Sequence, residues 1–269
     1  MISTFLFSLF LAATTQASAG RIALVQYNAD RYFDQYEINQ TNLTNMASAA
    51  VANHVNIIVF PEGSLYGYAS ANRDEQWCRQ SSGFGCHDVS KIAEAVPAGA
   101  STLYWESFAK SNGVYVLFNL PEKVADARYR NTTVVVGPNG YVGKYSKRVL
   151  YHTNQAYAEA GTDDFILDTP FGKFGLLTCM DAAYENKLED YKSKVNSVIL
   201  MMDWDDDPNS SVGARVFFER RSTETDLTIY ASDMSDWDGS GVYRPNQPRE
   251  RNGLAPIAIG VDGITYHDL

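Results

Sequence analysis

The sequence predicts an α/β protein with a mixed sheet. Short apolar runs of strand length recur along the chain, as in Val55–Phe60. Segments with apolar residues three and four positions apart, as in Asn39–Asn53, separate these runs and indicate helices. Turn sequences such as Pro138-Asn139-Gly140 lie between extended segments and indicate hairpins. Strands that alternate with helices are typical of parallel sheets, and the inserted hairpins add antiparallel neighbours.

The first half of the chain indicates three strands and two helices. Each strand is an apolar run, and Pro61 ends the second one because proline cannot continue a sheet ladder. The polar, glycine-containing stretch 68–100 predicts mainly loop. In chain order the elements are strand Ile22–Gln26, helix Asn39–Asn53, strand Val55–Phe60, helix Ser101–Ser111 and strand Val114–Asn119.

The second half continues this alternation and adds two hairpins, with turns at 138–140 and at Asp262-Gly263. No repeat, linker or low-complexity tract divides the chain, so we expect one domain. The elements are hairpin Thr132–Val136 with Tyr141–Tyr145, strand Phe174–Thr178, helix Tyr184–Lys194, strand Val198–Met202, helix Ser211–Thr225, strand Leu227–Ser232 and hairpin Ala255–Tyr266.

Composition and charge exclude several classes of protein. The 269 residues include 45% hydrophobic and 20% charged side chains, which is ordinary for a globular protein and argues against disorder. With 22 Lys+Arg against 32 Asp+Glu, the net charge of −10 argues against nucleic acid or an anionic membrane surface as partner. Beyond the first residues, no stretch approaches the roughly 20 apolar residues that a membrane span needs.

The N-terminal residues have the features of a secretory signal. Residues 1–19 carry no charged side chain, Phe5–Ala13 is apolar, and Ala17-Ser18-Ala19 has the small-x-small form that signal peptidase accepts. We therefore expect a signal peptide over 1–19, a mature domain over 20–269, and a secreted, extracellular protein. The alternative is a buried first strand or helix.

The three cysteines fit an oxidising compartment. Cys78 and Cys86 flank a short polar loop and are predicted to form a disulfide. Cys179 is then the odd thiol, either a reactive group or a small buried hydrophobe. Four N-x-[ST] sequons make the protein a candidate glycoprotein. They lie at Asn39, Asn42, Asn131 and Asn209.

Three chemically capable side chains follow extended segments. Glu62 comes directly after the Val55–Phe60 strand, Lys147 lies in the sequence GKYSKR after the hairpin, and Cys179 ends an apolar strand. Strand ends are where active sites of α/β domains usually lie. Taken singly, each has a structural alternative: a loop carboxylate, a solvated basic patch and a buried cysteine.

Together, the strand-PEG, GKYSKR and strand-TCMD segments, in this order, resemble the nitrilase superfamily of carbon–nitrogen hydrolases. The resemblance covers nearly all of residues 20–269. It implies an α-β-β-α sandwich, with two mixed sheets between outer helices, and a catalytic triad of Glu62, Lys147 and Cys179. Members often pair through their outer helices, which makes a homodimer a candidate assembly.

The chemistry suits these residue types. Cys179 would attack the amide carbon, and Lys147 with the backbone N–H of Met180 would stabilise the oxyanion. Glu62 would protonate the departing amine and then activate water against the thioester. No metal or organic cofactor is required, and the four histidines show no zinc-ligand spacing.

Longer segments, including PEGSLYGY and GSGVYRPNQP, resemble the vanin and biotinidase branch, whose members are secreted amidases of pantetheine or biotin amides. Many superfamily members hold a second glutamate after the lysine; here Asn154 takes that place, with Glu159 as the alternative. Trp204 matches a tryptophan of the branch. We expect Asn154, Trp204 and Asp205 at the substrate pocket, where acidic residues would favour neutral or cationic substrates.

The alternative interpretation of the acidic run Asp203–Asp207 is a solvated loop that does not reach the pocket.

The leading functional hypothesis is a secreted amidase that hydrolyses a non-peptide, linear amide of a small molecule through a thioester. The alternatives are a catalytically silent binding glycoprotein of the same fold and a nitrile hydrolase.

N-terminal sequencing of the secreted protein tests the signal peptide. We expect Gly20 as the first residue, because the small side chains of Ala17 and Ala19 satisfy signal peptidase. A secreted chain that begins at Met1 would contradict this prediction.

Overall fold

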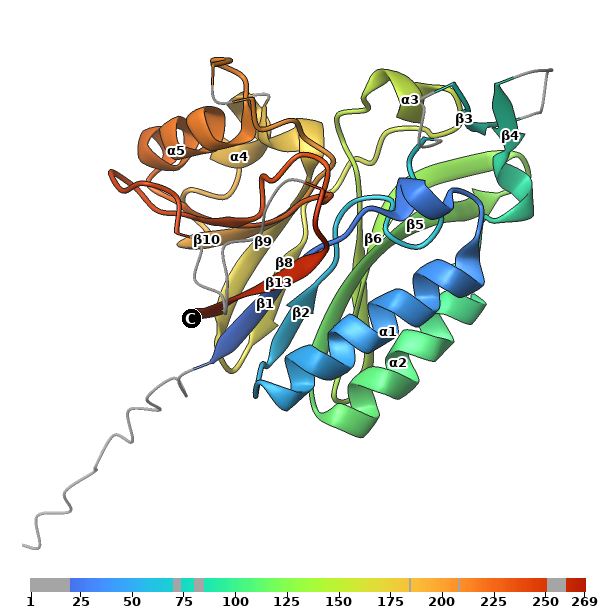
Figure 1. Cartoon of the computed structure of the whole chain (residues 1–269), viewed down its shortest axis with the longest axis horizontal. Helices are drawn as coiled ribbons and strands as arrows, with labels where there is room; N and C mark the ends of the chain where they lie inside the picture. Colours follow the sequence, from blue (N-terminus) through green and yellow to red (C-terminus); the bar gives the residue numbers. More distant parts are fainter. Residues whose placement is uncertain (1–19, 70–73, 80–84, 184, 208, 251–259) are drawn as a thin grey trace, which may run out of the picture.

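Two β-sheets pack face to face, and helices cover the outer face of each (Figure 1). The computed structural model describes residues 20–69, 74–79, 85–183, 185–207, 209–250 and 260–269. Four layers result, in the order helices, sheet, sheet, helices. The α/β class and the α-β-β-α sandwich that the resemblance implies are therefore confirmed.

The first sheet has six strands in the order β13-β1-β2-β5-β6-β7. Strands β1, β2 and β5 run parallel, whereas β13 and the β5–β6–β7 hairpins pair antiparallel. The strands are β1 (Arg21–Gln26), β2 (Ile57–Val59), β5 (Tyr115–Ala125), β6 (Arg128–Gly137), β7 (Gly140–Ser146) and β13 (Gly263–Asp268). Its outer face carries helices α1 (Tyr36–Ala52) and α2 (Ala100–Asn112).

The second sheet has five strands in the order β12-β11-β10-β9-β8, with β9, β10 and β11 parallel. The strands are β8 (Ile166–Thr169), β9 (Gly172–Thr178), β10 (Ser197–Met201), β11 (Thr228–Ser232) and β12 (Gly241–Tyr243). Helices α4 (Glu185–Glu189) and α5 (Ala214–Thr225) lie on its outer side, opposite α1 and α2 (Figure 1).

Short elements connect these layers. They are the 3-10 helices η1 (Ala29–Tyr32), η2 (Val89–Lys91) and η3 (Cys179–Ala182), the strand pair β3 (Gln76–Cys78) and β4 (Cys86–Asp88), and helix α3 (His152–Gln155). Each 3-10 helix follows an extended segment or a strand end, where a polar side chain can cap its first amides. In η2 this cap is Asp88, whose side chain accepts from the Ser90 amide at 2.9 Å.

Apolar residues on both faces of the central strands form the core. Leu24, Leu117, Leu176 and Ile199 belong to one buried cluster that lies between the sheets and extends to α5. A second cluster lies beneath α1 and α2, where Trp105 packs against Phe60 with ring centroids 4.9 Å apart. Strands buried on both faces must be continuously apolar, which explains the runs that the sequence shows.

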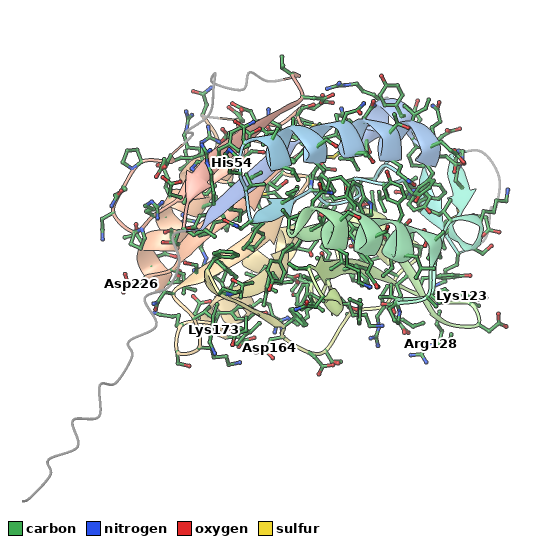
Figure 2. The ribbon with its side chains drawn as sticks, turned by 90° about the horizontal axis from the view of Figure 1, so that it is seen from below. His54, Lys123, Arg128, Asp164, Lys173 and Asp226 are labelled. Carbon is green, nitrogen blue, oxygen red and sulfur yellow. A yellow bond between two sulfur atoms is a disulfide. The ribbon has the colours of Figure 1, made fainter. Side chains whose placement is uncertain are left out.

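Charged side chains lie at the periphery. Lys123, Arg128, Asp164 and Lys173 are exposed, and Figure 2 shows them pointing outward around the sandwich. This distribution follows from the cost of burying a charge without a partner. The few fully buried charges are therefore the exceptions that need an explanation.

The structure corrects several predicted elements. Residues 263–268 form β13, which pairs with β1 rather than with a preceding hairpin arm; 255–259 lie outside the described residues. Helix α4 ends at Glu189, before the predicted Lys194, because the chain turns where Tyr191 packs into the core. The stretch 68–100 holds the strand pair β3–β4, because non-local pairing overrides its polar composition.

The predicted disulfide is present and joins β3 to β4 through Cys78 and Cys86, with Cα atoms 5.9 Å apart.

Two sequon predictions are wrong for the folded chain. Asn39 and Asn131 are buried with exposures of 0% and 1%, and their amides are hydrogen-bonded inside the protein. A glycan has no room at either site. Asn42 and Asn209 reach the surface and stay predictions. No described helix has both the length and the apolar character to cross a membrane.

The two sheets are joined by the side chain of Ser232 at the end of β11. Its Oγ is 2.5 Å from the Val25 carbonyl oxygen of β1 and 3.1 Å from the Val59 carbonyl oxygen of β2. The hydroxyl is fully buried, so water cannot replace it as a donor. This bond fixes the carboxyl ends of strands from the two sheets against each other.

Ser232→Ala should lower the free energy of unfolding by about 1–3 kcal/mol, because two buried carbonyl oxygens lose their shared donor. Urea denaturation measures the change. Ser48→Ala is the control: its hydroxyl also donates to a carbonyl, but on the exposed face of α1, and should change stability by no more than about 0.5 kcal/mol. Equal effects of the two variants would refute the bridging role.

Candidate active site

The sandwich brings three strand ends together. Glu62 lies three residues beyond β2, Lys147 directly follows β7, and Cys179 directly follows β9. The first two belong to one sheet and the third to the other. Face-to-face packing of the sheets therefore unites side chains that lie far apart in the sequence, as the resemblance implies.

Glu62 and Lys147 form a fully buried ion pair. The Lys147 Nζ donates to Glu62 Oε1 at 2.6 Å, and both side chains are 0% exposed. Asn131 Nδ2 donates to the same oxygen at 2.7 Å. Among the described residues, none donates to Glu62 Oε2. That oxygen is the one through which Glu62 can exchange a proton with another group.

Burial and charge act in opposite directions on these groups. Burial raises the pKa of Glu62, and the Lys147 ammonium only partly offsets it. For Lys147, burial lowers the pKa, but Glu62 and Cys179 outweigh it, so the pKa is raised. The site therefore contains a stable ammonium beside a carboxylate that accepts a proton more readily than a solvated one.

Cys179 is buried and has left-handed backbone, with φ of 48°. Such a conformation is uncommon for a residue with a Cβ, and here it marks the sharp turn from β9 into η3. The Sγ lies 3.7 Å from the Asp203 carbonyl oxygen. Burial raises the pKa of the thiol well above its usual value, although Lys147 acts against this. Burial therefore favours the thiol over the thiolate.

The Met180 amide is the next donor along the chain. Met180 follows Cys179 inside η3, and the first amides of a helix have no intrahelical acceptor. The oxyanion role of this N–H stays a prediction, and its place directly after Cys179 is compatible with it.

Sequence reasoning missed Asp181, which ties the thiol segment to the lysine segment. Its Oδ1 accepts from the Arg148 and Val149 amides at 3.0 and 2.6 Å. Its Oδ2 accepts from Tyr145 Oη at 2.7 Å and from the Thr178 amide at 3.1 Å. The strand end of β9 is therefore fixed against the segment that carries Lys147. The TCMD motif contained this residue, but nothing in its pattern indicated the partners.

Asn154 does not lie on the pocket surface, so its prediction as a pocket residue is wrong. It is fully buried behind Lys147, and its Oδ1 accepts from Lys147 Nζ at 2.7 Å and from Tyr68 Oη at 3.1 Å. Asn154 therefore supports the lysine, as its proposed place in the motif implies. The alternative, Glu159, instead pairs with Arg128 at 2.8 Å.

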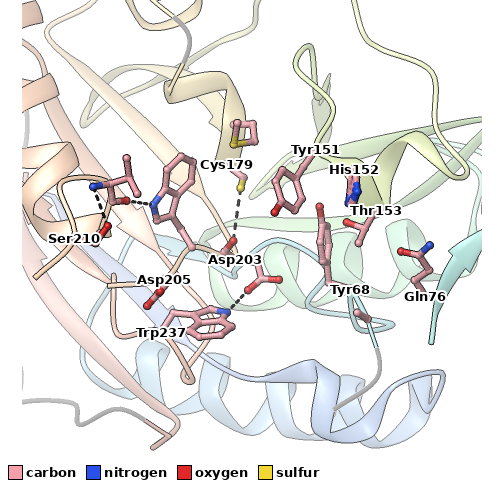
Figure 3. A pocket seen from close by; sticks show the side chains of 15 residues that line it. Tyr68, Gln76, Tyr151, His152, Thr153, Cys179, Asp203, Asp205, Ser210 and Trp237 are labelled. Atoms are coloured by element: carbon pink, nitrogen blue, oxygen red, sulfur yellow. Dashed lines mark hydrogen bonds between the residues drawn. The ribbon is translucent and has the colours of Figure 1, made fainter. Parts of the chain in front are cut away.

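A cavity of about 530 Å³ opens at Cys179 (Figure 3). Trp204 and Asp205, two of the predicted pocket residues, line it, and the sequence analysis did not indicate the other aromatic side chains. The lining side chains with aromatic rings or carboxylates are Tyr68, Tyr151, His152, Asp203, Trp204, Asp205 and Trp237.

The acidic run is thus only partly a solvated loop. Asp203 lines the cavity and accepts from the indole N–H of Trp237 (Figure 3). Asp206 is buried, where it accepts from the Arg215 amide at 2.6 Å and pairs with Arg249 at 3.1 Å. A charge run alone cannot show which of its members point inward.

No group of metal-binding side chains occurs among the residues that the structure describes.

Comparison with known proteins identifies the family. A model of the carbon-nitrogen hydrolase family matches residues 21–231, which is more than half of the chain. The chain belongs to the carbon-nitrogen hydrolase family. The resemblance to the nitrilase superfamily is confirmed.

This carbon-nitrogen hydrolase is 30% identical over 162 residues to a nitrilase of Pyrococcus abyssi, which covers 60% of the chain and 56% of the relative. It is 25% identical over 234 residues to a pantetheinase of Mus musculus, which covers 75% of the chain and 43% of the relative. The chain thus spans about half the length of these curated relatives. Pantetheinases are among its relatives, as the branch resemblance implies.

A solved structure of an amidase from Nesterenkonia, a cysteine variant, has the same fold. Its TM-score is 0.75 at 19% sequence identity, over 94% of this chain and 92% of the amidase. In another structure of that amidase, the acetamide moiety of fluoroacetamide is covalently added at the active-site cysteine.

Asn154→Asp should shift the pH dependence of Cys179 alkylation by iodoacetamide to higher pH, by about half to one unit. The added carboxylate lies beside an already charged Lys147 and makes ionisation of the nearby thiol less favourable. The alkylation rate is measured from pH 6 to 10. Asn112→Asp, on the exposed end of α2, should leave the curve unchanged. An unshifted Asn154→Asp curve would show that Asn154 does not act on the thiol's environment.

Proposed function

We propose that this carbon-nitrogen hydrolase is a cysteine-dependent amidase in which Glu62, Lys147 and Cys179 form the catalytic triad. The observation that carries the proposal is the fully buried Lys147–Glu62 pair behind a thiol that lines a cavity. A buried ion pair contributes little to stability compared with apolar side chains, so its presence beside a nucleophile favours a chemical role.

In the first step, Cys179 Sγ forms a bond to the carbonyl carbon of the substrate amide while its proton passes to Glu62. The Glu62 carboxylate suits this because burial raises its pKa toward that of a working base. Negative charge develops on the carbonyl oxygen. The Lys147 ammonium and the Met180 amide then stabilise this oxyanion.

In the second step, the carbon–nitrogen bond breaks and Glu62 gives its proton to the departing amine. A thioester on Cys179 remains. Glu62 next takes a proton from water, whose oxygen bonds to the thioester carbon. The carbon–sulfur bond breaks, the acid leaves, and the proton on Glu62 returns to the thiolate, which restores the resting enzyme.

For the substrate, we propose a neutral, extended amide such as pantetheine or a biotin amide. The pantetheinases among the relatives support this, as does a cavity of about 530 Å³, which is large enough to hold more than the scissile group. Two carboxylates, Asp203 and Asp205, line the cavity, so a neutral substrate is favoured over an anionic one.

We also propose that the enzyme acts outside the cell. The Cys78–Cys86 disulfide supports this, since such bonds persist in oxidising compartments. The exposed sequon at Asn209 is compatible with a glycan there. The homodimer stays a prediction from the family resemblance.

Nitrile hydrolysis is a second candidate because of the relative in Pyrococcus abyssi that is named a nitrilase. Attack of the same thiol on a nitrile carbon gives a thioimidate, and addition of water to it with loss of ammonia gives the same kind of thioester. The test below therefore includes a nitrile arm.

The mature protein should release cysteamine from pantetheine, and Cys179→Ala should abolish the release. Glu62→Gln should lower kcat by about 10²- to 10⁴-fold, because proton transfer to the amine is lost. Cysteamine is quantified by thiol derivatisation and chromatography.

Asp88→Asn changes a partly exposed carboxylate that caps η2; it is the matched control for Glu62→Gln and should keep kcat. Release of cysteamine by Cys179→Ala would refute the role of Cys179 as the nucleophile. Hydrolysis of 3-hydroxypropionitrile without hydrolysis of pantetheine would favour the nitrile hydrolase. Binding of pantetheine without turnover of either compound would favour the silent binding glycoprotein.

A further inference from the structure

Another buried carboxylate, Asp233, contacts the backbone of the cavity residue Trp204 and takes no part in the proposed chemistry. It follows β11 directly and is 0% exposed. Its Oδ1 accepts from the Trp204 and Met234 amides at 3.0 and 2.9 Å, and its Oδ2 accepts from the Gly239 amide at 2.9 Å. All three donors are backbone groups, so this carboxylate organises the chain rather than another side chain.

These three bonds connect two loops. Trp204 belongs to the segment that follows β10, whereas Met234 and Gly239 begin and end the turn that follows β11. Asp233 thus closes the 234–239 turn on itself and fixes it to the neighbouring loop. A Cβ at Gly239 would lie 2.3 Å from Asp233 Oδ2, so the turn requires glycine there for close approach to the carboxylate.

Each loop carries one tryptophan of the cavity wall. The Trp204 ring stacks on Phe217 of α5 with centroids 5.5 Å apart, and its Nε1 donates to the Val212 carbonyl at 2.8 Å. The Trp237 indole donates to the Asp203 carboxylate, which lies below Cys179 in Figure 3. Both rings line the cavity together with Cys179.

Burying a carboxylate is costly, and three amide bonds in one place offset that cost only if their geometry is kept. Loss of the carboxylate would remove the acceptor of all three amides, and of the two contacts between the loops described above only the Trp237–Asp203 hydrogen bond would remain. The loops would then separate from their present positions, while the strands beneath them stay paired.

We propose that Asp233 is a positioning residue that holds Trp204 and Trp237 as one wall of the substrate cavity. It thereby sets the affinity for the part of the substrate beyond the scissile amide. The identity of that substrate rests on the proposed function, whereas the placement of the two rings does not.

The test compares Asp233→Ala with Asp233→Asn. Alanine removes all three acceptor contacts, whereas asparagine keeps one oxygen for the Trp204 and Met234 amides and should give an intermediate effect. Asp236→Ala is the matched control, since Asp236 is an exposed carboxylate of the same turn.

Quenching of tryptophan fluorescence by succinimide measures how accessible Trp204 and Trp237 are to the solvent. The chain has four tryptophans, and Trp77 and Trp105 are only 2% and 0% exposed, so a change in quenching reports Trp204 and Trp237. Asp233→Ala should raise the quenching constant about twofold or more at a temperature well below its Tm. Far-UV circular dichroism should stay unchanged.

Kinetics with pantetheine give the second readout. Asp233→Ala should raise KM about tenfold or more and change kcat by less than about threefold, because the wall contributes binding that is equal in the ground and transition states. Asp233→Asn should fall between this variant and the wild type. Asp236→Ala should match the wild type in both measurements.

Unchanged quenching in Asp233→Ala would overturn the proposal, even if the variant were less stable. Increased quenching with an unchanged KM would also overturn it, because the wall would then not contribute to substrate binding. If no variant and no wild type hydrolyses pantetheine, the proposed function fails. Protection of Cys179 from iodoacetamide by pantetheine then replaces KM, and equal protection in wild type and Asp233→Ala would overturn the positioning role.

Discussion

The buried ion pair between Lys147 and Glu62 is the constraint on which the site depends. An ammonium and a carboxylate lose their hydration when they are fully buried, and only close contact with each other and with further hydrogen bonds makes this tolerable. Asn131 supplies such a bond to Glu62, and Asn154 supplies one to Lys147. The pair therefore fixes the ends of β2 and β7. It also places an ammonium close enough to Cys179 to lower the pKa of the thiol against the effect of burial.

Buried carboxylates that bind backbone amides hold the surroundings of this pair. Asp181 accepts from an amide of β9 and from an amide of the segment that follows Lys147. Asp233 accepts from amides of two cavity loops. Each fixes irregular chain against the end of a strand. Irregular segments carry most of the cavity, so acceptors of this kind give them the rigidity that a site for one substrate requires.

The sandwich explains why residues from distant parts of the sequence meet. Parallel strands end at the same edge of a sheet, and the two sheets pack with these edges adjacent, as the bonds of Ser232 to β1 and β2 show. The thiol that follows a strand of one sheet then lines the cavity, and the ion pair from the other sheet lies buried close enough to act on the pKa of that thiol. Family membership agrees with this arrangement, since the matched region 21–231 contains all three side chains.

The sequence alone determined the strand and helix alternation, the Cys78–Cys86 pair, and the three candidate catalytic side chains, because apolar periodicity and short motifs are local properties. It did not determine which polar residues are buried. Asn131 and Asn39 match a glycosylation pattern yet lie in the interior, and Asn154 supports a lysine instead of facing the cavity. The tertiary structure decided these outcomes, as it decided the roles of Asp181 and Asp233, because burial and hydrogen-bond partners depend on segments that are distant in the chain.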